Sequence, residues 1–243
     1  MMYEMTILVS NSHVDNNELM KPDAILNVLQ DIEGMHIKEL KTFTKHLNDN
    51  NLGVFLLYRQ VEIIRKPKFG EKIIVSTYPY NTNIIGGYRH IYISNEAGEK
   101  LVKTNAFGAY VNLNTYVPTR IPKDIALSIN DGVKDESIPD YPRKIHYDED
   151  KLQFLEHITI RKSHIDRYNH VNNVHYVTFV LDAINRNIDF DRIRAEYLKS
   201  FRLHDVVNIY YEMNDSTKNK AVFVLKDNAN LVNAVIEFSK NNS

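Results

Sequence analysis

Residues 161–176 read Arg-Lys-Ser-His-Ile-Asp-Arg-Tyr-Asn-His-Val-Asn-Asn-Val-His-Tyr. The stretch places a carboxylate, Asp166, four residues before an imidazole, His170, and it leads into apolar positions with helical spacing. A fainter copy stands near the N-terminus, where Ser12-His13-Val14-Asp15 matches Ser163-His164-Ile165-Asp166. Continued without gaps, this match sets Leu19 opposite His170. We therefore expect a duplicated fold in which only the second copy retains the reactive groups.

The segments that follow each copy repeat in the same order. Helical spacing covers Asp23–Leu47, with a break expected at Gly34, and then Val174–Ile184 in the second half. In the first half we predict strands over Gln60–Arg65, Lys72–Tyr78, Tyr88–Ser94 and Lys100–Asn112, with a sharp bend at Gly86-Gly87. In the second half we predict strands over Glu156–Arg161, Arg194–Leu198, Val206–Met213, Lys220–Lys226 and Leu231–Phe238. A curved antiparallel sheet is the economical cover for one long helix, so each half is predicted to be an α+β hotdog fold, and the chain two tandem hotdog folds, a double hotdog.

Residues 118–150 have the composition of a connector. They contain four of the seven prolines and a cluster of acidic residues, a composition that rarely packs into a core. We therefore predict an N-terminal domain over 1–130 with a degenerate site, a linker over 131–150, and a C-terminal domain over 151–243 that carries the motif.

Composition excludes several classes of function. The formal net charge of -1 argues against a nucleic-acid-binding protein, and no apolar run is long enough for a transmembrane helix. The first ten residues lack the features of a secretory signal, so we expect a cytoplasmic location. The chain has no cysteine, which excludes disulfides, thiolate zinc sites and a cysteine nucleophile.

The motif Asp166-Arg-Tyr-Asn-His170-Val-Asn-Asn-Val-His-Tyr176 resembles the D-x-N-x-H-V-N-N-x-x-Y motif of acyl-acyl carrier protein thioesterases, double-hotdog enzymes of plastids and bacteria. The first half supports the resemblance with Arg59–Ile63, Pro67–Glu71, Tyr88-Arg89 and Val117–Pro122. The resemblance covers about residues 5–240. It implies hydrolysis of fatty acyl thioesters on the phosphopantetheine of acyl carrier protein, an acyl chain bound largely by the N-terminal half, and a homodimer.

The resemblance also implies a set of site residues. The family's motif Asp and His correspond to Asp166 and His170. Its motif Asn is replaced by Tyr168, and its Glu, four residues after Glu196, is replaced by Ser200. These two departures motivate a rival function, a non-catalytic module that binds acyl chains or acyl carrier protein. A second rival is a thioesterase that acts on coenzyme A thioesters.

Thioester hydrolysis needs a positioned water, a base and donors for the developing oxyanion. His170 has a suitable ordinary pKa for the base. Asp166 can orient water, act as the base itself, or hold a charged intermediate. The backbone N–H groups at the start of the predicted helix, around Val171–Asn173 and first of all those of Val171 and Asn172, are expected to be unpaired oxyanion donors. Tyr168 is a candidate hydrogen-bond donor in place of the missing amide, and Ser200 is a candidate to position water.

Each of these residues also has a purely structural interpretation. In that interpretation Asp166 caps a turn, His170 is a structural histidine, and Asn172 and Asn173 cap a helix. Tyr168 is then a core residue and Ser200 an ordinary strand residue. His164, Asp166, His170 and His175 do not match a standard metal motif, so we predict neither a metal nor a cofactor. Seven basic residues are candidates to meet an acidic carrier protein, or alternatively are solvated: Arg59, Arg65, Lys66, Lys68, Arg194, Lys199 and Arg202.

Overall fold

The computed structural model describes residues 2–130, 132–184, 188–213 and 219–240. The chain forms two compact units, 1–57 with 61–140 and 58–60 with 141–243. The boundary at 140/141 falls inside the predicted linker 131–150. Residue 1 of the predicted N-terminal domain, residue 131 of the predicted linker, and residues 185–187, 214–218 and 241–243 of the predicted C-terminal domain lie outside the described residues.

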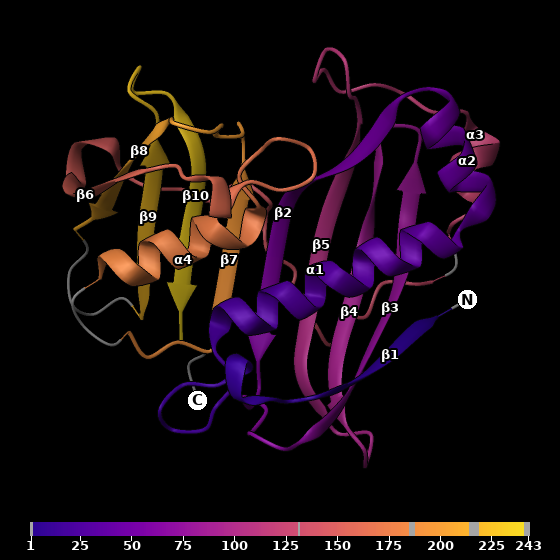
Figure 1. Cartoon of the computed structure of the whole chain (residues 1–243), viewed down its shortest axis with the longest axis horizontal. Helices are drawn as coiled ribbons and strands as arrows, with labels where there is room; N and C mark the ends of the chain where they lie inside the picture. Colours follow the sequence, from indigo (N-terminus) through magenta and orange to yellow (C-terminus); the bar gives the residue numbers. More distant parts are fainter. Residues whose placement is uncertain (1, 131, 185–187, 214–218, 241–243) are drawn as a thin grey trace. The chain divides into compact units, whose positions relative to one another are not determined.

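The N-terminal unit has one long helix across an antiparallel sheet (Figure 1). Its strands lie in the order β1-β3-β4-β5-β2. Its elements are β1 (Tyr3–Leu8), η1 (Asn11–His13), α1 (Pro22–Glu39), α2 (Lys41–Asp49), β2 (Leu52–Ile63), β3 (Lys72–Asn83), β4 (Gly86–Asn95), β5 (Lys100–Asn112) and α3 (Lys123–Leu127).

The helical prediction for this unit is confirmed in position but wrong in its break. α1 begins at Pro22, which suits a first helical position, and buries an apolar face that includes Ile25, Leu29 and Ile32. It runs through Gly34 without interruption, and the chain breaks at Leu40 before α2 begins. Because this face stays buried on both sides of Gly34, at Ile32 and at His36, packing outweighs the low helix propensity of one glycine.

The C-terminal unit repeats this arrangement. Its strands lie in the order β6-β8-β9-β10-β7, and α4 crosses them in Figure 1. Its elements are η2 (Glu149–Lys151), β6 (Leu152–Thr159), η3 (Lys162–His164), α4 (Asn173–Ala183), β7 (Arg192–Tyr197), β8 (Val206–Glu212), β9 (Lys220–Lys226) and β10 (Val232–Ser239).

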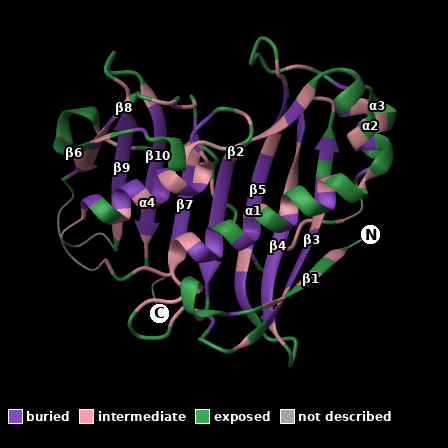
Figure 2. Ribbon diagram, in the orientation of Figure 1, coloured by how far each residue is buried: buried purple, intermediate pink, exposed green. Residues whose placement is uncertain are grey.

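The two sheets have the same connectivity. In each unit the first strand pairs with the third, the third with the fourth and the fourth with the fifth, while the second strand lies beside the fifth. Figure 2 shows the inner strands largely buried, whereas the edge strands β1 and β6 are more exposed. The predicted duplication is therefore confirmed. The predicted strands are present, with shifted ends at several positions: β2 begins at Leu52 and β3 extends to Asn83, for example.

Gly86 and Gly87 do not form the predicted bend, because they begin β4 and the turn lies at residues 84–85. A Cβ at Gly86 would stand 2.3 Å from the backbone oxygen of Gly108 on β5, so glycine is required by close approach of the two strands.

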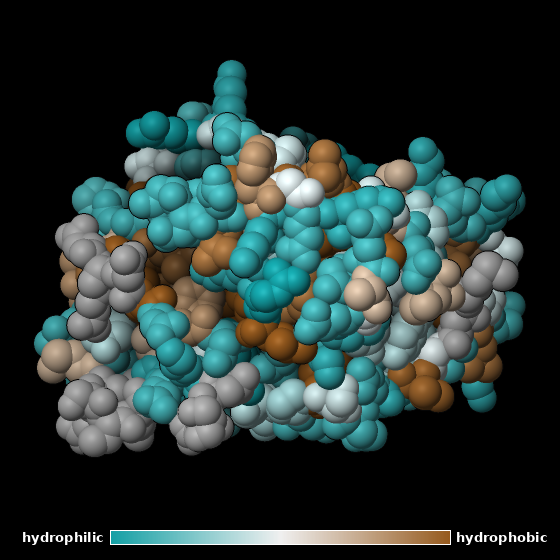
Figure 3. All heavy atoms as spheres, turned by 90° about the horizontal axis from the view of Figure 1, so that it is seen from below, coloured by the Kyte–Doolittle hydropathy of each residue, from teal (hydrophilic) through white to brown (hydrophobic). Residues whose placement is uncertain are grey.

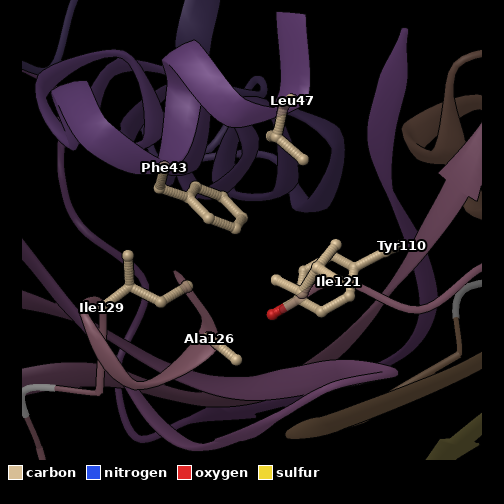
Figure 4. Close-up of a cluster of buried hydrophobic side chains, with 6 residues drawn as sticks. All are labelled: Phe43, Leu47, Tyr110, Ile121, Ala126 and Ile129. Atoms are coloured by element: carbon tan, nitrogen blue, oxygen red, sulfur yellow. The ribbon is translucent and has the colours of Figure 1, made fainter. Parts of the chain in front are cut away.

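The connector packs into a core, contrary to its composition. A buried cluster in the N-terminal unit joins two side chains of α2 and one of β5 to three side chains of the connector, and Figure 4 shows these six facing one another: Phe43, Leu47, Tyr110, Ile121, Ala126 and Ile129. In the C-terminal unit, Ile145 packs against Val222, Val224 and Val235. A few apolar residues at the right positions anchor a segment that is otherwise polar and rich in proline.

The face drawn in Figure 3 is mostly hydrophilic, with apolar side chains in small groups between polar ones. Within the described part of the chain, we find no helix with the length and apolar character needed to cross a membrane.

Candidate active site

The motif residues form a tight turn between η3 and α4. The Oδ1 atom of Asp166 accepts hydrogen bonds from the N–H groups of Tyr168, at 2.8 Å, and His170, at 3.3 Å. The Asp166 N–H donates to the His170 carbonyl at 2.8 Å, and Ile165 bridges to Val171. Asn169 has a positive φ of 59°, a conformation that asparagine tolerates better than most residues. Asp166 therefore caps the turn, as its structural interpretation predicted.

The turn presents His170 directly before α4. The His170 side chain is only 4% exposed. The helix begins at Asn173, and its cap is Asn172, whose Oδ1 accepts the Val174 N–H at 3.0 Å. The capping role considered for Asn172 is thus confirmed, and it leaves His170 beside the first turn of a helix.

Burial lowers the pKa of His170 below its ordinary value. The Arg202 cation lowers this pKa further, and the Asp166 carboxylate partly offsets both effects. At neutral pH the imidazole is therefore neutral, which is the form that accepts a proton. By its sequence, Arg202 is only a candidate for contact with a carrier protein. Its effect on His170 arises because the loop after β7 folds against the turn, a contact that local sequence does not predict.

Two of the predicted oxyanion donors, the N–H groups of Val171 and Asn172, are already paired, so the expectation that they are free is wrong. The Val171 N–H donates to the Phe201 carbonyl at 3.0 Å, and the Asn172 N–H donates to the His164 carbonyl at 2.9 Å. Both acceptors lie outside the helix, so helix rules alone could not anticipate them. Within the described ranges, the Asn173 N–H has no hydrogen-bond acceptor, and it stands at the positive end of α4.

Tyr168 is half-buried on the same turn. Its hydroxyl accepts a hydrogen bond from Arg167 Nη2 at 3.0 Å, and the Arg167 guanidinium lies 4.9 Å from the ring centroid. The hydroxyl therefore sits in a positive environment, two residues from both Asp166 and His170.

Ser200 lies in the loop between β7 and β8, so its interpretation as a strand residue is wrong. The next residue, Phe201, receives the Val171 N–H, which brings this loop against the His170 turn. Glu196 cannot replace the missing acid. Its neighbour Tyr197 reaches the Asn173 carbonyl of α4, so Glu196 faces the other side of the sheet. There its carboxylate accepts the Ile145 N–H at 2.8 Å.

The N-terminal copy reproduces the turn without the imidazole. Asp15 Oδ1 accepts the N–H groups of Asn17 and Leu19, at 2.8 and 3.1 Å, and Val14 bridges to Met20. Glu18 takes the positive φ, 61°, at the position that corresponds to Asn169. Leu19 stands where His170 stands, as the ungapped match predicted.

Two of the seven basic residues proposed for carrier-protein contact are buried, which excludes them from that role. Arg59 is 3% exposed and Arg194 is 6% exposed. The Arg194 guanidinium pairs with Glu237 at 2.9 Å and also donates to the Tyr58 hydroxyl. Among the described residues, no three His, Asp or Glu side chains are grouped to hold a metal ion.

Comparisons with known proteins agree across both units. Residues 1–129 match the family model for the acyl-ACP thioesterase N-terminal domain, and residues 147–240 match that for the C-terminal domain. A chloroplastic acyl-[acyl-carrier-protein] hydrolase from Cuphea viscosissima is 24% identical over 80% of this chain, and a chloroplastic oleoyl-acyl carrier protein thioesterase from Coriandrum sativum is 23% identical over 85%. The chain spans only 50% and 61% of their lengths.

Solved structures give the fold. A Bacteroides thetaiotaomicron acyl-ACP thioesterase superposes with a TM-score of 0.85 at 21% identity, covering 98% of this chain and 97% of that one. The 12:0-ACP thioesterase from Umbellularia californica gives a TM-score of 0.80 at 19% identity, covering 98% and 96% of the two chains. These likenesses confirm the predicted double hotdog fold.

Proposed function

Because the chain belongs to the acyl-ACP thioesterase family, we propose that it hydrolyses fatty acyl thioesters of acyl carrier protein to free fatty acid and carrier protein. The observation that carries this proposal is the buried, neutral His170 held by a capped turn at the start of α4. In this proposal the C-terminal unit supplies the chemistry, and the N-terminal unit, with Leu19 at the corresponding position, binds the acyl chain.

The reaction is a direct attack by water. His170 takes a proton from water as the oxygen bonds to the thioester carbonyl carbon. The intermediate then collapses, the carbon–sulfur bond breaks, and the imidazolium returns its proton to the leaving thiolate. Asp166, whose charge already favours protonated His170, stabilises the imidazolium between these steps.

The oxyanion donor in this proposal is the Asn173 N–H rather than the N–H groups of Val171 and Asn172. It has no acceptor within the described part of the chain, and the helix dipole favours negative charge there. Tyr168 donates a second hydrogen bond to substrate or water, and Ser200 positions the attacking water from the adjacent loop.

The test is free-acid release from acyl carrier protein thioesters of graded chain length, with matched coenzyme A thioesters measured in parallel. We expect a higher kcat/KM on the carrier-protein substrates, and loss of turnover in His170→Ala with the fold retained. A preference for coenzyme A substrates would assign the chain to that class of thioesterase instead. Tight binding of acyl carrier protein with no product released would instead establish the non-catalytic module that Tyr168 and Ser200 suggest.

Two further predictions accompany the proposal. The homodimer stays a prediction that the mass of the protein in solution tests. The cytoplasmic location stays a prediction for cell fractionation.

A further inference from the structure

Phe201 holds the loop after β7 against the His170 turn, because both its backbone carbonyl and its backbone N–H are hydrogen-bonded. Its carbonyl accepts the Val171 N–H at 3.0 Å. Its own N–H donates to the hydroxyl of Tyr176, on α4, also at 3.0 Å. Tyr176 is 2% exposed and its ring lies 5.5 Å from that of Tyr197 and 5.7 Å from that of Phe201, so its hydroxyl is fixed in place.

The N-terminal copy closes the same contact without a hydroxyl. There the Met20 N–H donates to the Pro67 carbonyl at 2.8 Å, the counterpart of Val171 and Phe201. Because proline has no N–H, Pro67 needs no hydrogen-bond acceptor from the helix, whereas Phe201 does. The residue that corresponds to Tyr176 is accordingly Ile25, which is fully buried. The buried hydroxyl is thus present only in the unit that carries the histidine.

We propose that Tyr176 is a positioning residue for the reaction, whose hydroxyl holds the segment Ser200–Arg202 against the His170 turn. The proposal rests on the proposed function, in which His170 is the base. A buried peptide N–H needs an acceptor, and within the described residues Tyr176 is the acceptor that Phe201 has. Removing the hydroxyl leaves that N–H unsatisfied, and the segment relaxes away from the turn to reach water.

Relaxation of the segment changes the surroundings of His170 in one direction. The charged groups that act on His170 are Asp166 on the turn and Arg202 on the loop, and Asp166, Asp205 and Tyr197 act on Tyr176. His164, on η3, also meets the turn, through its carbonyl. The loop meets the turn through the Phe201 carbonyl and carries the Arg202 cation, and burial and this cation both disfavour the imidazolium. Release of the loop therefore raises the pKa of His170 toward its ordinary value. It also displaces Ser200.

The experiment is Tyr176→Phe, which removes one oxygen and retains the ring. We expect kcat to fall by about tenfold to a hundredfold, the scale of a small displacement of catalytic groups, with KM changed much less. The acidic limb of the kcat/KM profile, which reports the free enzyme, should move to higher pH. Tyr80→Phe is the matched control, because it removes a buried hydroxyl that donates to Asn105 at 2.8 Å in the N-terminal unit. The control should lose stability without moving the acidic limb.

An unchanged kcat and acidic limb in Tyr176→Phe would overturn the proposal. A loss of kcat with the limb unmoved would reduce Tyr176 to a packing residue and also overturn it. If wild type releases no acid from any thioester, the proposed function fails, and NMR titration of the His170 ring, assigned with His170→Gln, still tests the contact. A His170 titration at higher pH in Tyr176→Phe than in wild type supports the role of the hydroxyl. Identical titrations reject it.

Discussion

The turns at residues 10–22 and 161–173 have the same capped backbone, and only the second carries His170, the proposed base. Asp15 and Asp166 cap their turns with the same pairs of N–H groups, and the helix that follows begins at Pro22 in one copy and at Asn173 in the other. Loops after β2 and β7 meet the turns through the carbonyls of Pro67 and Phe201. The geometry of the turn therefore belongs to the fold and does not depend on catalysis. What distinguishes the second copy is His170 and Tyr168 on the turn, Tyr176 on the following helix and Arg202 on the facing loop, with an N–H at Asn173 where Pro22 has none.

The largest test gives the second turn the residue that the first turn has at the position of the proposed base. His170→Leu should lower kcat for thioester hydrolysis by about 10²- to 10⁴-fold, the usual contribution of a general base. Its melting temperature should change little, because Leu19 already occupies this position in a turn of the same geometry. The control is Leu19→Ala, which should lower stability without a loss of kcat on that scale. If His170→Leu retained most of its turnover, the distinction between the copies would have no catalytic meaning.

Replacing the capping aspartates Asp15 and Asp166 by asparagine distinguishes their role as turn caps from the effect of their charge. An asparagine keeps the acceptor oxygen of Asp15 or Asp166, so both turns should persist, but Asp166→Asn removes the charge that stabilises imidazolium. We expect kcat to fall by about 10- to 100-fold, since interactions with charged groups contribute about 1.5–3 kcal/mol. Asp15→Asn should leave kcat unchanged. Equal effects of the two substitutions on turnover would mean that Asp166 acts as a cap alone.

The pH profile sharpens the role of the groups around His170. Only neutral imidazole accepts a proton, so kcat/KM should be constant near neutrality and fall as pH drops through the His170 pKa, which burial and Arg202 keep below the ordinary 6.5. Arg202→Gln removes a cation, so the His170 pKa rises and the acidic limb moves to higher pH. Lys66→Gln, at the N-terminal counterpart of Ser200, is a control that should not move it. A limb that stays in place in Arg202→Gln would assign the titration to another group.

Local sequence was sufficient for the duplicated turn but not for its contacts. The ungapped match correctly set Asp15 against Asp166 and Leu19 against His170, because a capped turn is specified by a few adjacent residues. The pairing of the Val171 N–H with Phe201 spans thirty residues of chain, so helix rules wrongly left that donor free. Tyr176 belonged to the motif, yet its spacing indicated only an apolar helix position. The buried connector residues Ile121 and Ile145 were missed for a similar reason, since average composition hides single anchors.

The smallest test concerns a third position that the copies share. Gly70 and His204 both have positive φ, 76° and 73°, in the loops that meet the two turns. Their N–H groups donate to corresponding carbonyls, those of Val9 and Ile160. A Cβ at Gly70 would meet nothing within 4 Å, so Gly70→Ala measures backbone strain alone and should lower the free energy of unfolding by about 1–2 kcal/mol.

The matched substitution in the second copy is His204→Ala. Histidine and alanine at position 204 have the same cost for the left-handed conformation. The free energy of unfolding should therefore change by less than about 0.5 kcal/mol, as for ordinary surface substitutions. His204→Gly should also be nearly neutral, because the relief of strain is offset by the greater freedom of glycine in the unfolded chain. Denaturant melts of the three variants measure these differences. A cost for His204→Ala as large as that for Gly70→Ala would mean that the His204 side chain makes a stabilising interaction beyond the shared backbone, so that the copies differ here as they do at His170.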